Sequence, residues 1–301
     1  MTDTATTMKA PARSVITPRP FLKWVGGKGQ LLPELRKHVP ATFGDYHEPF
    51  IGGGAMFFDL ARAGLIASPR CAHLSDTNEL LFRTYRGVRE MDLDAAPGLA
   101  AQLALLQENG NTETVFQYMK DAQTADPSLS ARKDAYVAAW MIYINKTCFN
   151  GLFRVNSKGV FNVGFGAYKN PKIFDEENLR ACSAALQNAH LSRRPWHASL
   201  GDGLVSPGDL VYVDPPYMPA KTAGFVSYGA DRFGMDDHAA LAARMAQLKK
   251  NGVHIIVSQS DDPRVRELYP ESVFGVHRVE ARRSVNSKGT ERGPVGELII
   301  T

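Results

Sequence analysis

Short apolar runs alternate with helix-like segments along most of the chain. The runs at 210–213 and 253–258 are dominated by β-branched and other apolar residues, which is typical of strands buried on both faces of a parallel sheet. Two further strands are predicted at 45–50 and 71–75, and the first is followed by a glycine turn and an apolar helix. This alternation predicts an α/β fold with a Rossmann-like sheet.

The middle of the chain has a different pattern. Residues 79–142 have apolar positions at helical spacing near both ends and a polar centre, which predicts a helical insertion rather than more of the sheet. In 145–171, Asn-Gly and Lys-Gly turns between short aromatic stretches indicate a β-hairpin or long ordered loops. The α/β pattern then resumes with a predicted helix over 178–189 and a strand that ends at Asp202.

These patterns divide the chain into a discontinuous α/β domain and one insertion. Residues 1–19 are rich in Thr, Ala and Pro without periodicity, and we predict a disordered leader there. Residues 20–78 and 175–301 form the α/β domain, whose last part, 276–301, holds two strand-like runs. The insertion spans 79–174 and is predicted to be mostly helical, with a β-hairpin near its end. A chain of 301 residues suffices for one large domain with such an insertion.

Composition narrows the class of protein. Apolar residues make up 44% and charged residues 22%, as in ordinary soluble globular proteins. The three cysteines include no C-x-x-C pair, and their odd number suits a reducing compartment. The eight histidines show no metal-ligand spacing, and no apolar run approaches the roughly 18 residues needed to cross a bilayer. We therefore expect a cytoplasmic protein without a structural metal or a membrane span.

Asp214, Pro215, Pro216 and Tyr217 directly follow the apolar run at 210–213. The two prolines end the strand because each lacks an N–H and has its φ fixed. The loop therefore displays a carboxylate and a phenol at the carboxyl end of a strand, where open α/β sheets bind their ligands. The structural alternative is a strand end followed by a tight turn with a capping aspartate.

This loop has the groups that are needed to methylate an exocyclic amine. The N6 lone pair of adenine is delocalised into the ring, so the amine is a poor nucleophile. The Asp214 carboxylate and the Pro215 carbonyl can hold both N6 hydrogens and draw the nitrogen towards a tetrahedral shape, while Tyr217 stacks on the base. With a methyl donor placed in line, the reaction depends on positioning and needs neither a metal nor a covalent intermediate.

Two glycine-rich turns indicate a nucleotide-like cofactor. The Gly-Gly-Lys-Gly turn around Lys28 suggests an anion or a close backbone approach, and the nearby Trp24 is either a core residue or packs on a purine. Gly52 and Gly54 lie between a strand and a helix, as at the opening of a Rossmann-like nucleotide site. Asp76 ends the next strand, where an acid that binds ribose hydroxyls is expected, and it also suits the N-cap of the following helix.

Basic residues are concentrated between positions 131 and 174. Seven lysines and arginines stand there against one acid, Asp134: Arg132, Lys133, Lys146, Arg154, Lys158, Lys169 and Lys172. They are interleaved with Phe and Asn, so the stretch offers phosphate contacts, base-edge hydrogen bonds and rings that stack. It is either a nucleic-acid surface or a solvated hairpin with a small aromatic core.

Five stretches, in this order, resemble one family. They are F-L-K-W-V-G-G-K at 21–28, E-P-F-I-G-G-G at 48–54, S-D-T-N at 75–78, C-F-N-G-L-F-R and the basic stretch after it at 148–171, and D-P-P-Y at 214–217. The combination is similar to the Dam-type (D12 class) adenine-N6 DNA methyltransferases. The resemblance implies a Rossmann-like methyltransferase sheet, S-adenosyl-L-methionine as methyl donor, and a target-recognition domain inserted between the cofactor half and the catalytic half.

The resemblance also implies roles for individual residues. Asp76 matches the acid that holds the ribose, and Asp202 matches the one near the cofactor adenine. The residues implied to bind the cofactor are Trp24, Lys28, Glu48, Pro49, Phe50, Gly52, Gly54, Asp76, Asp202 and Asp214. Those implied to act in catalysis are Asp214, Pro215, Pro216 and Tyr217.

Within the insertion, the resemblance implies a set of DNA-binding residues: Lys146, Phe149, Asn150, Arg154, Asn156, Lys158 and Lys169. Arg154 is the best candidate for reading a guanine through two hydrogen bonds. Two positions depart from the family, which often has Tyr in place of Phe149 and Pro in place of Gly164. Both departures bear on the recognised sequence, for which a GATC-like site is the expectation.

We therefore predict a site-specific DNA methyltransferase that moves a methyl group from S-adenosyl-L-methionine to N6 of an adenine rotated out of double-stranded DNA. We expect it to be a monomer or weak dimer in the bacterial cytoplasm or nucleoid, or phage-encoded, with restriction-modification as one role. The alternatives are an enzyme that acts on RNA or on the N4 amine of cytosine, and a DNA-binding relative without catalysis. The intact catalytic loop, both glycine turns and Asp76 argue against the last.

Overall fold

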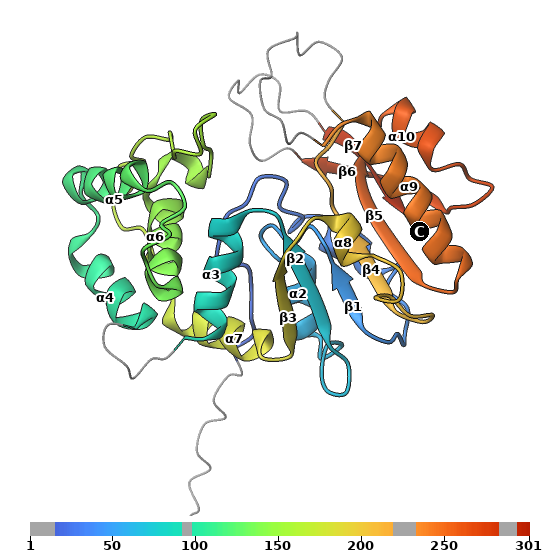
Figure 1. Cartoon of the computed structure of the whole chain (residues 1–301), viewed down its shortest axis with the longest axis horizontal. Coiled ribbons are helices and arrows are strands. Elements are labelled where there is room, and N and C mark those ends of the chain that lie inside the picture. Colours follow the sequence, from blue (N-terminus) through green and yellow to red (C-terminus); the bar gives the residue numbers. More distant parts are fainter. Residues whose placement is uncertain (1–15, 92–97, 219–232, 283–293) are drawn as a thin grey trace, which may run out of the picture.

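The computed structural model describes residues 16–91, 98–218, 233–282 and 294–301 (Figure 1). Within these residues a seven-stranded sheet has the order β3-β2-β1-β4-β5-β7-β6. The strands from β3 to β5 in this order are parallel, whereas β7 is antiparallel to both of its neighbours. The prediction of an α/β fold with a Rossmann-like methyltransferase sheet is confirmed. In chain order the strands are β1 (Tyr46–Glu48), β2 (Ala72–Asp76), β3 (Ala189–Arg193), β4 (Leu210–Val213), β5 (His254–Ser260), β6 (Val276–Arg282) and β7 (Pro294–Ile300).

The central strands are apolar on both faces, and this requires helices on both sides of the sheet. All four residues of β4 are buried. Leu210 and Tyr212 pack into the core on one face, and Val211 and Val213 pack into the core on the other. This alternation follows from the period of two along a strand. An exposed face would leave two of these side chains in water, so the strand is stable only between two layers.

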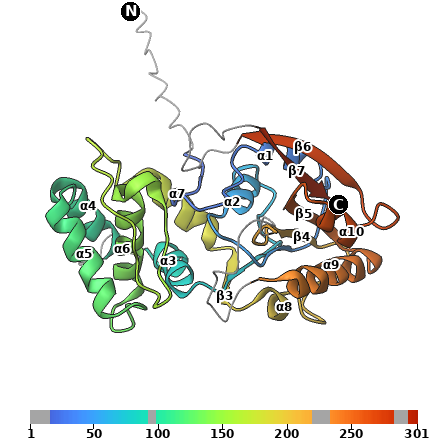
Figure 2. The ribbon, with the colours of Figure 1, turned by 90° about the horizontal axis from the view of Figure 1, so that it is seen from above.

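Two helical layers provide that cover (Figures 1 and 2). Residues of α1, α2, α3 and α7 join the core that contains Tyr212, and residues of α8, α9 and α10 join the core that contains Val211. The helices of the first face are α1 (Leu32–Arg36), α2 (Ala55–Arg62), α3 (Glu79–Arg89) and α7 (Glu176–Leu186). Those of the second face are α8 (Trp196–Ser199), α9 (Met235–Lys250) and α10 (Pro263–Leu268).

The prediction of a strand that ends at Asp202 is wrong. The strand lies earlier, at β3 (Ala189–Arg193), and the segment before Asp202 forms the short helix α8. Pro195 explains the change because it has no N–H with which to continue a strand ladder. Its carbonyl instead accepts a hydrogen bond from the Ala198 N–H (3.0 Å), which begins the helix.

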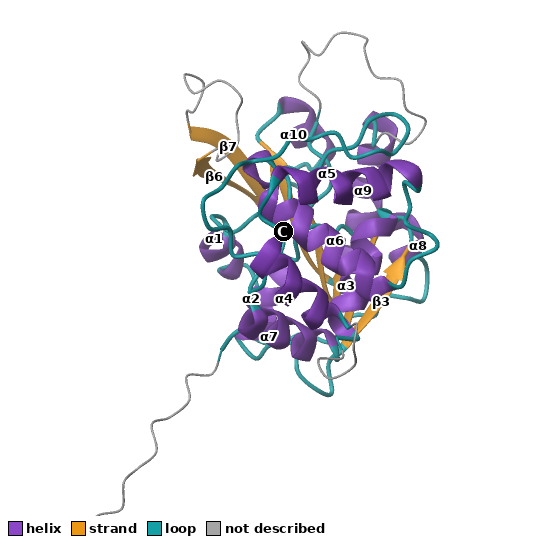
Figure 3. Ribbon diagram, turned by 90° about the vertical axis from the view of Figure 1, so that its left-hand side faces the viewer, coloured by secondary structure: helices purple, strands orange, loops and turns teal. Residues whose placement is uncertain are grey.

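A helical segment lies beside the sheet and contains α4 (Leu99–Asn109), α5 (Glu113–Ala125) and α6 (Asp134–Thr147). In Figure 3 these helices face the viewer, with β6 and β7 towards one side and β3 towards the other. Buried side chains of α6 hold the segment together: the Trp140 indole donates to the Met119 carbonyl (2.7 Å), and the Tyr143 hydroxyl donates to the Gly110 carbonyl (2.7 Å).

Helix α3 belongs to both parts of the molecule. It packs on β2, β3 and α7, and it also packs on α6 along most of its length. A Cβ added to Gly87 of α3 would lie 2.6 Å from the Asp134 carbonyl oxygen, so the absence of a side chain lets the two helices approach closely. The predicted start of the insertion, at residue 79, therefore coincides with a helix that both parts share.

The segment predicted to form a β-hairpin has little regular pairing. Its described antiparallel contacts are two isolated bridges, Cys148 with Phe165 and Val155 with Phe161, and a 3₁₀ turn spans Phe149–Gly151. Gly151 and Gly159 have positive φ values of 66° and 75°, which interrupt an extended ladder. The hairpin is thus an antiparallel loop rather than two continuous strands.

The N-terminal segment is tied to the sheet layer at Arg19. Its N–H donates to the Asn178 side chain (3.0 Å), and its guanidinium pairs with Asp175 (2.5 Å). Arg19 is the last residue of the predicted disordered leader of 1–19, and the boundary of that leader stays a prediction. Residues 1–15 of the prediction lie outside the described residues.

Candidate active site

The predicted acids gather at one edge of the sheet. Glu48 ends β1, Asp76 ends β2, and Asp214 follows β4. Because β1 pairs in parallel with both β2 and β4, the carboxyl ends of all three strands meet at the same edge. The catalytic loop and the second glycine turn, far apart in the chain, are thereby brought to one edge of the sheet.

Lys28 binds Asp214 at this edge. Its Nζ lies 2.6 Å from Oδ1 and 2.8 Å from Oδ2 of Asp214, and it also donates to the Gly26 carbonyl (2.8 Å). The Lys28 side chain is only 5% exposed. Burial raises the pKa of Asp214 to about 6, although the positive charge of Lys28 lowers it. Asp214 is therefore ionised at neutral pH and has a fixed cationic partner.

Tyr217 is held from two directions. The Lys28 ammonium lies 4.6 Å from the centre of its ring, within range of a cation–π interaction. The phenol hydroxyl donates to Oε2 of Glu297 at 2.6 Å. Burial, together with the negative charges of Asp214 and Glu297, raises the pKa of Tyr217 far above its ordinary value. Tyr217 is thus an uncharged phenol with its hydrogen committed to Glu297.

The two prolines of the loop have different surroundings. Pro215 is buried, whereas Pro216 is exposed. The Pro216 carbonyl lies 3.5 Å from the side-chain amide of Gln259, a buried residue of β5. The catalytic loop is therefore held through its backbone by the neighbouring strand and through the Asp214 side chain by Lys28.

Glu48 is a second buried acid beside Asp214. It is 2% exposed and accepts a hydrogen bond from the Tyr46 hydroxyl at 2.8 Å. Burial raises its pKa to about 8, and the charge of Asp214 contributes to this rise. The adjacent Pro49 is buried, and the half-buried Phe50 makes an edge contact with Phe233 (5.6 Å between ring centroids).

The second glycine turn needs glycine for two separate reasons. Gly52 and Gly54 have positive φ values of 47° and 68°, which strain other residues. A Cβ added to Gly52 would also stand 2.9 Å from the Trp24 ring, and one added to Gly54 would stand 2.6 Å from the Tyr85 hydroxyl. The turn therefore lies directly against Trp24, so both predicted cofactor turns share one surface.

Asp76 supports this turn and does not cap α3. Its Oδ2 accepts from the Gly52 N–H (3.2 Å), and its Oδ1 accepts from the Asn78 N–H (2.9 Å). The N-cap of α3 is Asn78, whose side chain accepts from the Leu81 N–H (3.0 Å). Burial raises the pKa of Asp76. Its carboxylate has lone pairs left over for a further donor.

Asp202 has a different environment from the other predicted cofactor residues. Its side chain is 91% exposed, and its ion-pair partner is Arg244 of α9 at 2.8 Å. It lies in the loop between α8 and β4. No contact in the described residues joins it to Asp76 or to the glycine turns.

The basic stretch is fastened to the first glycine turn. Trp24 stacks on Phe153, with 5.4 Å between ring centroids and 16° between planes. Asn145, which is 1% exposed, exchanges two hydrogen bonds of 2.8 Å with the backbone of Lys23 and donates a third to the Gly151 carbonyl (3.0 Å). Sequence reasoning did not find Asn145, because a single asparagine inside an apolar helix carries no motif.

Most of the predicted DNA-binding side chains are exposed together. Phe149 is 59% exposed, and Asn150, Arg154, Asn156, Lys158 and Lys169 are also exposed. The loop among them is shaped by the Asn156 side chain, which accepts from the backbone N–H groups of Lys158 (2.9 Å) and Val160 (3.1 Å). Arg154 donates to Asn162 at 2.9 Å.

Lys146 differs from this group. It is partly buried in the last turn of α6, and burial together with the charge of Lys23 lowers its pKa.

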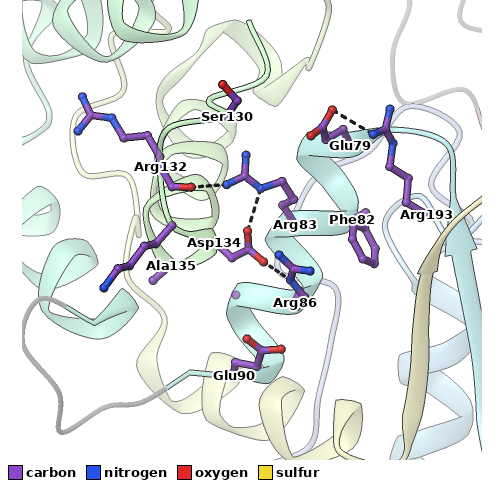
Figure 4. Close-up of a pocket in the computed structure, with 12 residues that line it drawn as sticks. Glu79, Phe82, Arg83, Arg86, Glu90, Ser130, Arg132, Asp134, Ala135 and Arg193 are labelled. Carbon is purple, nitrogen blue, oxygen red and sulfur yellow. Dashed lines mark hydrogen bonds and ion pairs between the residues drawn. The ribbon is translucent and has the colours of Figure 1, made fainter. Parts of the chain in front are cut away.

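A separate pocket lies between α3 and the start of α6 (Figure 4). Arg83 lines this pocket and donates to Asp134 (2.8 Å) and to the carbonyls of Ser128 and Leu129 (2.9 Å each). Arg86 also binds Asp134. Burial raises the pKa of Asp134, but these two arginines outweigh it and the pKa is lowered. Asp134 thus pairs with two arginines of α3, and these ion pairs tie α3 to the helical segment.

Glu297 is the site residue that sequence reasoning missed. It lies on β7, 80 positions after its partner Tyr217. The available signal was local: Glu297 is the only charged residue in the strand Pro294–Ile300, which is otherwise apolar.

Two further observations apply to the part of the chain that the structure describes. None of its helices is long and apolar enough to cross a bilayer. None of its groups of three or more His, Cys, Asp or Glu side chains is arranged to hold a metal ion.

Known proteins resemble this chain over almost its whole length. The family model described as D12 class N6 adenine-specific DNA methyltransferase matches residues 24–285. A type II methyltransferase of Lactococcus lactis subsp. cremoris is 37% identical over 96% of this chain and 97% of its own length. A type II methyltransferase of Methanocaldococcus jannaschii is 35% identical over 94% and 98%, and a DNA adenine methylase of Salmonella typhi is 32% identical over 93% and 94%.

Proposed function

Because the chain belongs to the D12 class N6 adenine-specific DNA methyltransferase family, it methylates N6 of adenine in DNA, and we propose how its residues do so. The methyl donor is S-adenosyl-L-methionine and the acceptor is an adenine flipped out of double-stranded DNA. One observation carries the proposal: the Asp214 carboxylate and the Tyr217 ring are held side by side at the carboxyl edge of the sheet, both in contact with Lys28.

The residues at the second glycine turn fit that donor. The turn comes so close to Trp24 that a Cβ on Gly52 would lie 2.9 Å from the ring. Glycine at such a turn lets a ligand approach the backbone closely. Gly52, Gly54 and Trp24 would line the donor, and the free lone pairs of Asp76 would accept its ribose hydroxyls. When bound, the donor supplies a methyl group on a sulfonium. Asp214 would place negative charge near that cation, whereas Glu48, whose pKa is raised to about 8, stays protonated at neutral pH.

Asp214 prepares the adenine amine. Its carboxylate and the Pro215 carbonyl accept hydrogen bonds from the two N6 hydrogens, so electron density returns to the nitrogen from the ring. When the N6–methyl bond forms, the bond between the methyl carbon and the sulfonium breaks, and one N6 hydrogen leaves as a proton. Each Asp214 oxygen has a second lone pair beyond the one that Lys28 uses, and the acceptor therefore works while the ion pair stays in place. Lys28 keeps the carboxylate ionised and fixes its direction, which is positioning rather than acid–base chemistry.

Tyr217 and the basic stretch orient the DNA. The phenol ring stacks on the flipped base and fixes its plane. Outside the pocket, Lys158 and Lys169 contact phosphates, Arg154 reads a guanine edge, and the exposed Phe149 ring fills the space that the adenine leaves. The segment 79–174 acts as the target-recognition domain on a chain that binds DNA as a monomer or weak dimer in the cytoplasm.

The test is single-molecule sequencing of genomic DNA from a methylation-free host that expresses the chain, with Asp214→Ala as control. We expect N6-methyladenine at one short motif, with GATC as the first candidate, and none in the control. Methylated cytosine N4, or methylated RNA with unmodified DNA, would assign a different acceptor. Soluble protein that binds DNA and modifies no nucleic acid would contradict the proposed catalysis.

A further inference from the structure

We propose that Glu297 is a positioning residue for the methyl transfer, which holds the Tyr217 ring in the orientation that the flipped base requires. This inference rests on the proposed function of Tyr217. The contact that supports it is a different one from those used above: the phenol hydroxyl of Tyr217 donates to Glu297 Oε2 at 2.6 Å, across a separation of 80 residues.

The antiparallel strand β7 explains how Glu297 reaches the site. Glu297 pairs with Ser260, the last residue of β5, and with Val279 of β6. A strand antiparallel to its neighbours begins at the edge where they end, so the start of β7 lies at the carboxyl edge with the catalytic loop. Leu298, Ile299 and Ile300 are buried after it, which anchors the strand and leaves Glu297 half-buried at the rim.

The backbone next to Glu297 is held closely. The Gly296 carbonyl accepts from the Asp261 N–H at 3.0 Å. A Cβ on Gly296 would lie 3.0 Å from the Asp261 side chain and 3.1 Å from the Arg278 guanidinium, so both side chains pack closely against this backbone. Asp261 is bound in turn by Arg266 and Arg278, each at 2.8 Å. The backbone that carries the Glu297 side chain is therefore held in place by its neighbours.

The bond to Glu297 restrains the rotation of the Tyr217 ring. A tyrosine has two side-chain torsions, and Lys28 at 4.6 Å from the ring centre contacts the face of the ring without holding its far end. The hydroxyl bond to a carboxylate is charge-assisted and short, and such bonds are roughly twice as strong as neutral ones. Together the two contacts fix the plane against which the base stacks.

Glu297 acts through Tyr217 rather than on the substrate. Its described hydrogen bond is the one to the phenol. The pKa of Tyr217 is raised far above its ordinary value by burial and by the nearby carboxylates, so the phenol keeps its hydrogen and relays no proton. Its contribution to Tyr217 is therefore geometric, and its negative charge also raises the pKa of Asp214.

The experiment compares Glu297→Ala, Glu297→Gln and Tyr217→Phe, together with the double variant Tyr217→Phe/Glu297→Ala. The exposed acid Glu271 supplies a matched control, Glu271→Gln. Each full-length variant is measured for three quantities: the single-turnover rate constant at saturating DNA and S-adenosyl-L-methionine, the Kd for S-adenosyl-L-methionine, and the fluorescence of a duplex with 2-aminopurine at the target adenine. The duplex carries the motif that genomic sequencing identifies.

We expect Glu297→Ala to lower the single-turnover rate constant by about 10- to 100-fold, as a misoriented reacting group does. Glu297→Gln keeps an acceptor for the hydroxyl and should lose about 3-fold or less. The Kd for the donor should change less than about 2-fold in either variant, because Glu297 does not contact the donor turn. The 2-aminopurine signal of Glu297→Ala should differ from wild type, because the base is stacked differently.

The double variant gives the sharpest outcome. Tyr217→Phe removes the hydroxyl that Glu297 holds, so adding Glu297→Ala to it should cost little further rate. An equal loss from Glu297→Ala in both backgrounds, or a wild-type rate in Glu297→Ala, would overturn the inference. If Glu297→Ala does not fold, Glu297→Leu takes its place, alone and combined with Tyr217→Phe, and the same two outcomes would overturn the inference. An inactive wild-type enzyme would instead overturn the proposed function, so the two failures are distinguishable.

Discussion

The Lys28 ammonium lies 2.6 Å and 2.8 Å from the two carboxylate oxygens of Asp214, although 186 positions separate the two residues. The ion pair joins the glycine turn at the start of the chain to the catalytic loop after β4. It also sets the protonation of the acceptor, because the positive charge opposes the rise in pKa that burial causes.

The activity should fall as the pH falls through about 6. Asp214 accepts an amine hydrogen only as a carboxylate, and its pKa in the folded protein is about 6. Above this value the acceptor is ionised, and below it each unit of pH lowers kcat/KM about tenfold. The check is kcat/KM for the DNA substrate between pH 5 and 9. A profile that stays flat from pH 5 to 7 would refute the role of the Asp214 charge.

Lys28→Met should move that midpoint to higher pH. Removing a cation in contact with a carboxylate raises the pKa of the carboxylate by about 1–3 units, so the variant should lose activity at pH 7 and recover part of it at pH 8.5 or above. The exposed Lys37, whose partner is Glu34, supplies the control Lys37→Met. An unchanged midpoint in Lys28→Met would mean that the ion pair does not control Asp214.

Tyr217→Phe should be milder than Tyr217→Ala. The phenylalanine ring still stacks on the base but loses the bond to Glu297, so we expect about a 10-fold fall in the methyl-transfer rate. Alanine removes the ring and should cost about 100-fold or more. Single-turnover rates measure both, and equal losses would show that the ring does not stack on the base.

Glu48 should make the protein less stable as the pH rises from about 4.5 to 8. The folded protein holds the proton on Glu48 up to a pKa of about 8, whereas the unfolded chain loses it at the ordinary value of 4.5. Unfolding is therefore increasingly favoured across this window, by about 1.4 kcal/mol for each unit that separates the two pKa values. Urea unfolding at pH 5, 6.5 and 8 gives the unfolding free energy at each pH, and this free energy should decrease less steeply with pH in Glu48→Gln than in wild type. The exposed Glu271→Gln should keep the wild-type dependence of the unfolding free energy on pH.

Asn145→Ala should loosen the basic stretch from the rest of the site. The change removes three hydrogen bonds and leaves the backbone groups of Lys23 and the Gly151 carbonyl without their partner. Buried groups left unsatisfied cost about 1–3 kcal/mol, so the midpoint of urea unfolding should fall. The exposed Asn109→Ala, in the last turn of α4, should change stability by no more than about 0.5 kcal/mol. DNA affinity should also fall in Asn145→Ala more than in the control.

Several features of the site follow from local chemistry and were predictable. The apolar run that ends at Asp214-Pro215-Pro216 determines a strand with a stiff loop after it, because prolines stop a ladder wherever they occur. Gly52 and Gly54 likewise predicted a turn between a strand and a helix, and in the structure they lie between β1 and α2 with positive φ values. Where local signals competed, the prediction failed: the segment before Asp202 has the composition of a short strand, but Pro195 begins a helix there.

The sequence by itself determined the strands other than β3, the glycine turns, the catalytic loop and the basic stretch, since each depends on neighbours within a few positions. Only the tertiary structure decided that Lys28 binds Asp214, that Asn145 joins the basic stretch to the first turn, and that Glu297 holds Tyr217. The physical reason is the order of the strands. The antiparallel insertion of β7 between β5 and β6 brings Glu297 to the catalytic edge, and no periodicity in the residues around position 297 encodes which strand will lie beside it.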